Sequence, residues 1–550
     1  MSSANINIAI LLDDQALHQP RQGAVYFPQG RDAQGRVAYT HLTFAQLKEQ
    51  SDYYAWALYN QGLRPGMKTL LMIRPSLEFY GLFFAIFKIG AIPILIDPGM
   101  GWPGFLKAVH NMQPEAFLGL PQAQLLRIFC RRYFKSVKIN ITLGKWRFWS
   151  GKTLSELRGK PGAFPLFKPE PEALAAVLFT SGSTGPAKGV CYTHEVFQTQ
   201  VRLLRREYDI KPGEMDLACF PLFSLFSLAL GAAVLIPDMN PSRPASVNPE
   251  RILEALHNMP VTYSFGSPAL WDSVSRYACK KQLKLPGLRR IIMAGAPVPA
   301  ALHERLFSIL PKGAETYTPY GATESLPVAN FKGSEMLEES TKERNLAGNG
   351  VCVGKPISEI EGCIIAISDA PVATMQDTEI LPPGQIGELC VSGPCVTREY
   401  YSQPEANKLA KIHDGDKLWH RIGDLGYFDG QGRFWFCGRK SHRVEFLDQQ
   451  NQTKTLFSIP CETIVNQIKG VRRSALVGMG SKPRQCPAIV IELEKNARLD
   501  QETVLAALAK NSLTAEIKKV FFHPELPVDL RHNAKINREE LALWAAKQKA

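Results

Sequence analysis

A chain of 550 residues exceeds the usual size of one hydrophobic core, so we expect at least two domains. Apolar residues make up 45% of the chain and charged residues 21%, which excludes wholesale disorder and is ordinary for a soluble globular protein. The net charge of +13 is compatible with contact to nucleic acid, acidic lipid or a polyphosphate substrate, and does not choose among them.

The first residues, MSSANINIAILLDDQ, contain no basic leader, so we expect no signal peptide. The longest apolar run, residues 79–96, is interrupted by Lys88, Gly90 and Pro93. This favours a buried helix followed by a strand over a membrane span. The eleven cysteines are scattered, odd in number and without the spacing of a metal site. They predict free thiols in a reducing environment, and so a cytoplasmic protein.

Helical patterns alternate with short β-rich runs through the first four hundred residues. In chain order, the expected elements are a strand at 69–73, a helix at 78–88, a strand at 92–96, a helix at 190–208, a strand at 216–220, a further apolar element at 228–236 and a strand at 290–294. This alternation predicts an α/β fold with largely parallel sheets, in which ligand loops follow the carboxyl ends of strands.

The densest basic segment, residues 127–152, reads RIFCRRYFKSVKINITLGKWRFWSGK and interleaves aromatic residues with Lys and Arg. One interpretation is a surface that contacts a membrane or an acidic partner. The other is an amphipathic helix followed by a strand, with a solvated basic face.

Beyond Pro382 the pattern changes to short strands and tight turns. Expected strands lie at 387–391, 427–429 and 433–437, and the turn at 429–432 suits a hairpin. The polar stretch 441–455 is typical of a linker and surface loop. A compact tail follows, with a helix at 461–467, strands at 475–479 and 488–493, and a helix at 502–509. We therefore predict two domains, residues 1–438 and 439–550.

Residues 178–190, LFTSGSTGPAKGV, directly follow the apolar run 173–177. Glycines let backbone N–H groups approach an anion closely, and hydroxyl groups and Lys188 add donors and charge. The segment is not a Walker A loop, because Lys188 is followed by Gly189 and the GxxxxGK spacing is absent. A flexible surface turn is the alternative, and the length of the motif behind a predicted strand disfavours it.

This segment resembles the phosphate loop of the adenylate-forming superfamily, which includes acyl-CoA synthetases, peptide-synthetase adenylation domains and luciferases. Similar motifs follow in family order: AGAP at 294–297, YGATE at 320–324, GEL at 387–389, RIGD at 421–424, GR at 438–439 and RHNAK at 531–535. The resemblance implies a large N-terminal domain of stacked mixed and parallel sheets with helices and a small distorted β-barrel. It also implies a small, mobile α+β C-terminal domain.

In this family a substrate carboxylate attacks the α-phosphate of ATP, and positive charge must offset the repulsion between the two anions. The resemblance implies ATP and Mg²⁺ as cofactors and three catalytic residues: Glu324 as the Mg²⁺ ligand, Thr323 on the α-phosphate, and Lys535 bridging carboxylate and phosphate. It assigns nucleotide contacts to Thr180, Ser181, Gly182, Ser183, Thr184, Gly185, Lys188, Gly295, Ala296, Pro297, Tyr320, Gly321, Asp424 and Arg439. Taken singly, Asp424 could instead be a turn residue and Lys535 a solvated charge.

Several stretches are similar to one subgroup, the β-lactone synthetases of long-chain olefin biosynthesis. They are residues 83–91, 97–101, 219–223, 318–327 and 527–536. The resemblance implies a long-chain 2-alkyl-3-hydroxyalkanoic acid as substrate, whose own hydroxyl displaces AMP to close a β-lactone. Phe223, Ser224, Ser267 and Pro268 are candidates for the wall of the acyl pocket, with ordinary core packing as the alternative.

Four departures from the wider family bear on the acceptor of the acyl group. Ser224 stands where many acyl-CoA synthetases have histidine, and Ile422 replaces a usual threonine. At the hinge, Ser441-His442 replace common aspartates, and the polar stretch 447–455 replaces a segment that usually bears glycine. These last two changes put thioester formation in doubt and fit an intramolecular acceptor.

The alternatives within the enzyme class are a long-chain fatty acyl-CoA ligase and an adenylation enzyme that feeds a carrier protein. From another class, the charge and the segment 127–152 would fit a nucleic-acid or membrane-surface binding protein. We find no recognisable nucleic-acid module and expect no nucleic-acid partner. Peripheral membrane contact and assembly with other olefin-pathway enzymes are both compatible with catalysis.

Overall fold

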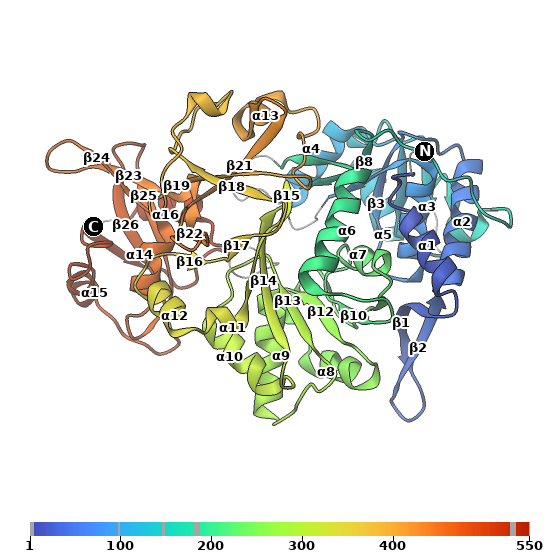
Figure 1. The fold of residues 1–550 in the computed structure, drawn as a ribbon, viewed down its shortest axis with the longest axis horizontal. Helices are drawn as coiled ribbons and strands as arrows, with labels where there is room; N and C mark the ends of the chain where they lie inside the picture. Colours follow the sequence, from blue (N-terminus) through green and yellow to red (C-terminus); the bar gives the residue numbers. More distant parts are fainter. Residues whose placement is uncertain (1–4, 97–99, 146–148, 180–186, 529–534, 549–550) are drawn as a thin grey trace.

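The computed structural model describes residues 5–96, 100–145, 149–179, 187–528 and 535–548. The N-terminal part contains three sheets with helices packed against them, and the C-terminal part is a smaller α+β unit, at the left in Figure 1. The predicted fold class is confirmed.

The largest sheet has nine strands, and its central strands are parallel. Their order is β17 (Lys355–Pro356), β15 (Ser325–Lys332), β14 (Glu315–Ala322), β13 (Arg290–Met293), β12 (Tyr263–Gly266), β10 (Met215–Ala218), β11 (Ala233–Leu235), β1 (Gly23–Arg31) and β2 (Val37–Thr43). The antiparallel pairs lie at its two ends, where β14 meets β15 and β1 meets β2.

A second sheet of seven strands is parallel except for its last pair. Its order is β7 (Lys152–Thr153), β6 (Ile139–Thr142), β5 (Ala116–Gly119), β3 (Lys68–Met72), β4 (Ile92–Leu95), β8 (Leu174–Phe179) and β9 (Gly189–Thr193). The candidate phosphate loop therefore follows β8, as predicted for a loop at the carboxyl end of a strand.

The third sheet is antiparallel and corresponds to the small distorted β-barrel that the resemblance implies. Its order is β16 (Val351–Cys352), β22 (Phe434–Arg439), β21 (Lys417–Phe428), β19 (Gly387–Ser392) and β18 (Glu361–Ile365), with β20 (Lys411–Asp414) paired to β21. In this structure its strands form one sheet with β16 and β18 at its two ends. The predicted hairpin turn at 429–432 connects β21 to β22.

The C-terminal part has a three-stranded sheet of β25 (Val471–Met479), β26 (Cys486–Leu493) and β27 (Lys519–Phe522). A separate hairpin is formed by β23 (Val444–Leu447) and β24 (Thr453–Leu456). The helices of this part are α14 (Ser458–Val465), α15 (Gln501–Leu508) and α16 (Arg538–Ala545).

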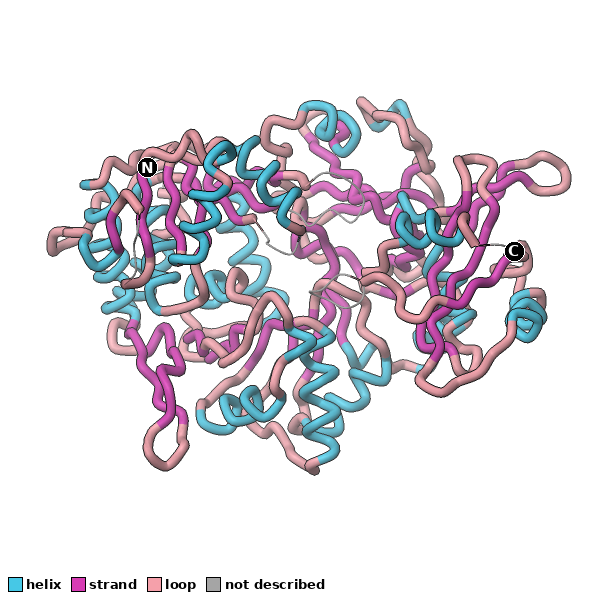
Figure 2. The backbone as a smooth tube through the Cα atoms, turned by 180° about the vertical axis from the view of Figure 1, so that it is seen from behind, coloured by secondary structure: helices cyan, strands magenta, loops and turns pink. Residues whose placement is uncertain are grey.

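Most of the N-terminal helices pack against the two large sheets, and the last two contact the antiparallel sheet (Figure 2). The N-terminal helices are α1 (Ile10–His18), α2 (Phe44–Asn60), α3 (Leu77–Ile89), α4 (Trp102–Met112), α5 (Pro121–Phe129), α6 (His194–Tyr208), α7 (Ser224–Ala229), α8 (Pro249–Asn258), α9 (Pro268–Lys280), α10 (Ala300–Ile309), α11 (Gly333–Met336), α12 (Glu339–Leu346) and α13 (Pro404–Ala410).

The expected helix at 190–208 is wrong at its start, because its first residues form β9 and only His194 onward is helical. The run of β-branched and aromatic residues at 190–193 pairs with β8. Thr193 then caps the helix, accepting a hydrogen bond from the backbone N–H of Val196 at 3.2 Å.

The stretch 441–455, expected as a linker and surface loop, is also corrected, because it contains most of the hairpin β23–β24. Val444 and Phe446 are buried on one face of β23, whereas Glu445 between them is only partly buried. The carboxylate of Asp448 accepts hydrogen bonds from the N–H groups of Gln450 and Gln452 and so closes the turn.

Helix α3 confirms the predicted buried helix and strand at 79–96. The side chain of Ser76 accepts a hydrogen bond at its N-terminus, and Gly90 ends it in the left-handed conformation at φ 79°. Its residues join a core cluster that contains strands of both large sheets.

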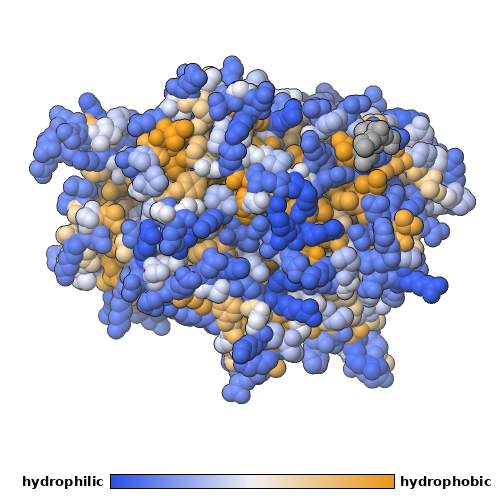
Figure 3. All heavy atoms as spheres, in the orientation of Figure 1, coloured by the Kyte–Doolittle hydropathy of each residue, from blue (hydrophilic) through white to orange (hydrophobic). Residues whose placement is uncertain are grey.

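No helix of the described residues is long and apolar enough to cross a membrane. On the face drawn in Figure 3, hydrophilic residues surround separate apolar areas. All eleven cysteines lie within the described residues as free thiols.

One charged side chain of α3 is fully buried. The ammonium group of Lys88 donates to Asp52 Oδ1 at 2.6 Å and lies 2.9 Å from Asp13 Oδ1. Asp52 Oδ2 also accepts from Lys48 at 2.7 Å. These contacts tie α1, α2 and α3 together.

We expect Lys88→Met to lower the free energy of unfolding by about 3 kcal/mol, because it leaves a buried carboxylate without its main cation. Urea unfolding of the intact chain, followed by tryptophan fluorescence, measures the change. Lys417→Met is the matched control: Lys417 pairs with Glu361 at the exposed surface, where such a pair contributes below about 1 kcal/mol. Equal effects of the two substitutions would contradict this account.

Candidate functional site

Three of the predicted nucleotide-binding residues are in direct contact. Asp424 on β21 lies opposite Arg439 on β22 in the ladder, and its Oδ1 is 3.1 Å from Arg439 Nε. The hydroxyl of Tyr320, at the end of β14, donates to Asp424 Oδ2 at 2.6 Å. The nine-stranded and the antiparallel sheets therefore meet at this carboxylate.

Burial and neighbouring charge shift the pKa of the Asp424 carboxyl in opposite directions. Burial raises the pKa of the Asp424 carboxyl, and the Arg439 guanidinium and the Tyr320 hydroxyl oppose that shift. The Asp424 carboxylate in turn raises the pKa of Arg439. Asp424 is 4% exposed, whereas the Arg439 side chain is 42% exposed, so the carboxylate is fixed and its partner reaches solvent. A fixed carboxylate with two acceptor oxygens suits a pair of vicinal hydroxyl groups.

The predicted residues Gly321, Thr323 and Glu324 lie where β14 turns into β15. A Cβ atom at Gly321 would come within 2.6 Å of the carbonyl oxygen of Ser325, so the turn excludes any larger residue. The carbonyl of Thr323 accepts a hydrogen bond from the Tyr192 hydroxyl at 2.5 Å, which anchors the turn to β9.

The Glu324 carboxylate has a partner that the sequence did not indicate. The hydroxyl of Tyr400 donates to Glu324 Oε1 at 2.7 Å, and burial together with Glu324 raises the pKa of that hydroxyl. The N–H of Thr397 donates to the Glu324 carbonyl at 2.8 Å. No pattern at 397–400 signals this role beyond the paired tyrosines that follow Glu399.

Lys188 lies on the same side of the site, with its ammonium group 4.8 Å from the centre of the Tyr400 ring. Tyr400 therefore links Lys188 to Glu324, which brings a cation and a carboxylate of the predicted site close together. The other predicted phosphate-loop residues, Thr180, Ser181, Gly182, Ser183, Thr184 and Gly185, lie outside the described residues.

Lys411, at the start of β20, is a second residue near the site that the sequence did not indicate. Its side chain is 5% exposed, and its ammonium group donates to the carbonyl of Thr397. Burial lowers the pKa of this amine to about 7, and the charge of Glu324 opposes the shift. No local sequence pattern marks Lys411, because its position near Glu324 depends on the pairing of β20 with β21.

Gly295, Ala296 and Pro297 follow β13 at the carboxyl edge of the nine-stranded sheet. Gly295 and Pro297 are exposed, and Gly295 has φ 98°, a conformation that favours glycine. Backbone with these properties can approach a flat ligand closely, so the position is compatible with the predicted nucleotide contact.

The candidate acyl pocket brings two segments together. The rings of Phe223 and Phe265 stack with centroids 3.8 Å apart. Ser224 is fully buried and its hydroxyl lies 2.6 Å from that of Tyr80. This contact shows why a small hydroxyl residue fits the position, since α3 already fills the space beside it.

Ser267 and Pro268, the other two candidates, begin α9. The hydroxyl of Ser267 accepts a hydrogen bond from the N–H of Leu270 at 3.3 Å, and Pro268 occupies the first helical position. Both therefore have a structural function as a helix start, next to Phe265.

Lys535 belongs to the C-terminal part and is exposed. It precedes Ile536, whose backbone forms a bridge with Val528. The residues before it, 529–534, lie outside the described residues, so the contribution of Lys535 to the site stays a prediction.

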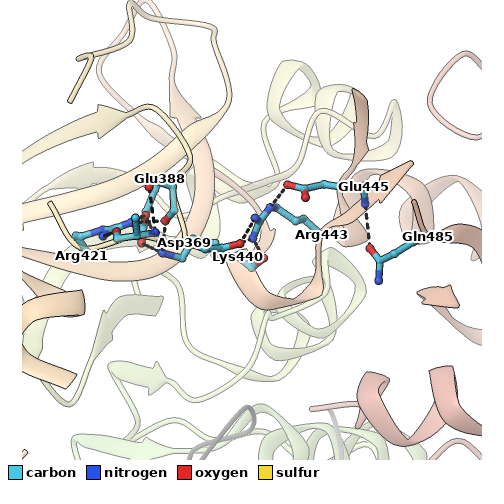
Figure 4. A network of polar contacts seen from close by, with 9 residues as sticks. Asp369, Glu388, Arg421, Lys440, Arg443, Glu445 and Gln485 are labelled. Atoms are coloured by element: carbon cyan, nitrogen blue, oxygen red, sulfur yellow. Dashed lines mark hydrogen bonds and ion pairs between the residues drawn. The ribbon is translucent and has the colours of Figure 1, made fainter. Parts of the chain in front are cut away.

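Ion pairs hold the segment between the two parts against the N-terminal part (Figure 4). Lys440 Nζ lies 3.0 Å from the buried Glu388 carboxylate, which also binds Arg421 at 2.6 Å. Further along, Arg443 pairs with Asp369 and Glu445. Glu388, Arg421 and Asp369 belong to the N-terminal part, so the connecting segment is held against it.

A metal site built from protein groups alone is absent from the described part of the chain, where no three His, Cys, Asp or Glu side chains cluster suitably. Glu324 nevertheless fits Mg²⁺, because Mg²⁺ is commonly held by one or two carboxylates together with substrate phosphates.

Comparison with known proteins agrees with this geometry. The family model described as AMP-binding enzyme matches residues 12–401. The olefin beta-lactone synthetase of Stenotrophomonas maltophilia is 42% identical, over 98% of both chains. The protein of the same name from Xanthomonas campestris is 41% identical, over 99% of this chain and 98% of its own.

Among solved structures, ATP-bound MatB from Rhodopseudomonas palustris has a TM-score of 0.77 at 19% identity, covering 99% of both chains. This likeness shows the shared fold of both parts. The chain thus belongs to the AMP-binding enzyme family and is an adenylate-forming ligase related to the olefin beta-lactone synthetases.

Proposed function

We propose that this enzyme activates a long-chain 2-alkyl-3-hydroxyalkanoic acid with ATP and converts the acyl-adenylate to a β-lactone, with release of pyrophosphate and AMP. The contact of Tyr320, Asp424 and Arg439 beside the turn that bears Glu324 carries the adenylation half of this proposal. The full-length identity to two olefin beta-lactone synthetases supports the lactone half.

In the first step a carboxylate oxygen attacks the α-phosphorus, and the bond to pyrophosphate breaks. We assign the ribose hydroxyls to Asp424 and Arg439, the α-phosphate to Thr323, and the β- and γ-phosphates to the loop that ends at Lys188. Glu324 would hold Mg²⁺, which neutralises phosphate charge when bound. Lys535 would bridge the carboxylate and the α-phosphate where negative charge develops.

In the second step the 3-hydroxyl oxygen attacks the acyl carbon, the bond to AMP breaks and the hydroxyl proton is released. The nucleophile belongs to the same molecule, so holding the chain in one geometry replaces the binding of a second substrate. The apolar surroundings of Phe223 and Phe265 suit a chain held in this way.

The connecting segment supports an intramolecular acceptor. We place the hinge at 438–441, and directly beyond it Arg443 Nη1 is 3.1 Å from Asp369 Oδ1. Within the C-terminal part, the following hairpin is joined to the residue before β26, since Glu445 and Gln485 exchange two hydrogen bonds, each of 3.0 Å. Rotation of the C-terminal part to admit a thiol would break ion pairs that lactone closure can leave intact.

We also propose a cytoplasmic location and contact with other enzymes of olefin biosynthesis. The free thiols support the first. The second is supported by the chemistry of the product, because an apolar lactone gains from direct transfer to the next enzyme.

Product analysis tests the overall reaction. With ATP, Mg²⁺ and a 2-alkyl-3-hydroxy acid, we expect AMP and a β-lactone in equal amounts by mass spectrometry, and the same yield with and without coenzyme A. A matched 2-alkyl acid that lacks the hydroxyl should undergo ATP–pyrophosphate exchange and give no lactone. Turnover that requires a thiol, with a thioester as product, would refute the lactone step.

Lys535→Ala is expected to lower ATP–pyrophosphate exchange by roughly 10²–10³-fold, the usual effect of removing a donor aimed at developing charge. ATP affinity, measured by calorimetry, should change little. Lys510→Ala, another exposed lysine of the C-terminal part, is the control and should keep full exchange. Normal exchange in Lys535→Ala would remove Lys535 from the reaction.

Asp424→Ala is expected to weaken ATP binding by about 10- to 100-fold, because two hydrogen bonds to a charged acceptor are lost. Tyr320→Phe keeps the ring and deletes only the hydroxyl that now binds Asp424. That variant should retain most of the affinity. Unchanged ATP affinity in Asp424→Ala, by the same calorimetry, would contradict the ribose assignment.

A further inference from the structure

The segment between Glu115 and Glu156 has a charge distribution that the active site does not use. It contains no Asp or Glu and eight basic residues: Arg127, Arg131, Arg132, Lys135, Lys138, Lys145, Arg147 and Lys152. None of these residues is among those assigned to nucleotide or acyl binding. More than half of the net charge of +13 is thus concentrated in one stretch of the sequence.

Helix α5, inside this segment, turns an apolar stripe toward solvent. Leu125, Ile128 and Phe129 are 44%, 38% and 83% exposed. Their spacing of three and four residues places them on one face of the helix. The opposite face packs inward through Ala123 and Leu126. Single exposed apolar residues are ordinary, whereas a stripe of three indicates an interaction surface.

Cations adjoin this stripe. Arg131 and Arg132 follow α5 after one residue, in the short helix η2 (Arg131–Tyr133), and Lys135 lies two residues beyond that helix; all three are exposed. Arg132 packs over the Tyr133 ring at 4.6 Å. Within the described residues, no acidic side chain forms an ion pair with these three, which leaves their charge available to an external anion.

A shallow hollow of about 370 Å³ lies beside the stripe. It is lined by Arg127, Ile128, Arg131, Phe134, Trp149 and Ser150. Two guanidinium groups above apolar and aromatic walls match the chemistry of a phosphate headgroup that is joined to an apolar tail.

We propose that this α5 surface, made of Leu125, Ile128, Phe129, Arg131, Arg132 and Lys135, docks the enzyme on an anionic lipid bilayer. Apolar side chains interleaved with Arg and Lys bind at the headgroup–acyl boundary, where the apolar groups leave water and the cations meet lipid phosphates. A nucleic-acid backbone would use the cations and leave the aliphatic Leu125 and Ile128 in water. A fluid lipid surface also needs no fixed arrangement of cations, which fits side chains without protein ion pairs.

The contact area is one short helix face, so binding is peripheral and reversible. It would bring an enzyme for long-chain acids to the phase in which such acids accumulate. The inference itself rests on the surface and not on the acceptor of the acyl group.

Co-sedimentation of the full-length protein with vesicles tests the proposal. We expect binding to vesicles of phosphatidylcholine with phosphatidylglycerol, little binding to phosphatidylcholine alone, and weakening with salt. The double variant Arg131→Gln/Arg132→Gln should bind about 30-fold more weakly, from two lost charges. Phe129→Ser should lower binding by roughly 10-fold through lost apolar burial.

The control variants carry the same changes elsewhere. Lys280→Gln/Lys281→Gln removes two exposed charges near the end of α9, and Leu543→Ser removes a residue that is 68% exposed on α16. Both should bind vesicles like the unchanged protein. ATP–pyrophosphate exchange should be the same in all four variants, which verifies that they fold.

Three outcomes would overturn the proposal: no binding to anionic vesicles, equal binding to neutral and anionic vesicles, or unchanged binding of the Arg131→Gln/Arg132→Gln variant. Duplex DNA that binds through these arginines while vesicles do not would assign the surface to nucleic acid. Retention by an acidic protein with no vesicle binding would assign it to a protein partner.

Discussion

The carboxylate of Glu388 is the contact on which the arrangement of the two parts depends. Its side chain is 1% exposed, it accepts from both Nε and Nη2 of Arg421, and it lies 3.0 Å from Lys440 Nζ. A buried carboxylate left without its cations costs about 3–5 kcal/mol, so these residues hold one another in place. They come from β19, from β21 and from the segment that leads to the C-terminal part (Figure 4).

The positions of the candidate nucleotide-binding residues follow from this constraint. Arg421 precedes Asp424 by three residues on the same strand, and Lys440 directly follows Arg439. Fixing Arg421 and Lys440 on one carboxylate therefore fixes the two strands from which Asp424 and Arg439 meet. Tyr320 arrives from the other sheet and closes the contact. Glu324 lies four residues beyond Tyr320, so the carboxylate proposed to hold Mg²⁺ and the hydroxyl that binds Asp424 are positioned by one short stretch of chain.

The sequence predicted the helices, strands and site residues at positions where the local pattern and the tertiary structure agree. The apolar runs at 69–96 form β3, α3 and β4, and the family motifs include Tyr320, Asp424 and Arg439, which are in contact. It failed where no local signal marks a boundary, as at Val190–Thr193, where a strand passes into a helix without Gly or Pro. Tyr400 and Lys411 could not be predicted, because their roles arise from pairing with distant partners. Hairpin β23–β24 was missed because only Val444 and Phe446 carry its buried face.

The ion pairs that hold the connecting segment against the N-terminal part also bear on the chemistry of the second half-reaction. An enzyme that passes its acyl group to a separate thiol must open a path for that thiol, and a mobile C-terminal part provides one. In this chain the connecting segment is tied to the N-terminal part by Lys440 and Arg443, and the hairpin beyond it is tied to Gln485. The pairs of Lys440 with Glu388 and of Arg443 with Asp369 cross between the two parts, so they oppose rotation and favour one arrangement. An acceptor on the substrate itself needs only that arrangement, because proximity of the hydroxyl to the activated carbonyl supplies what a second binding site would otherwise provide.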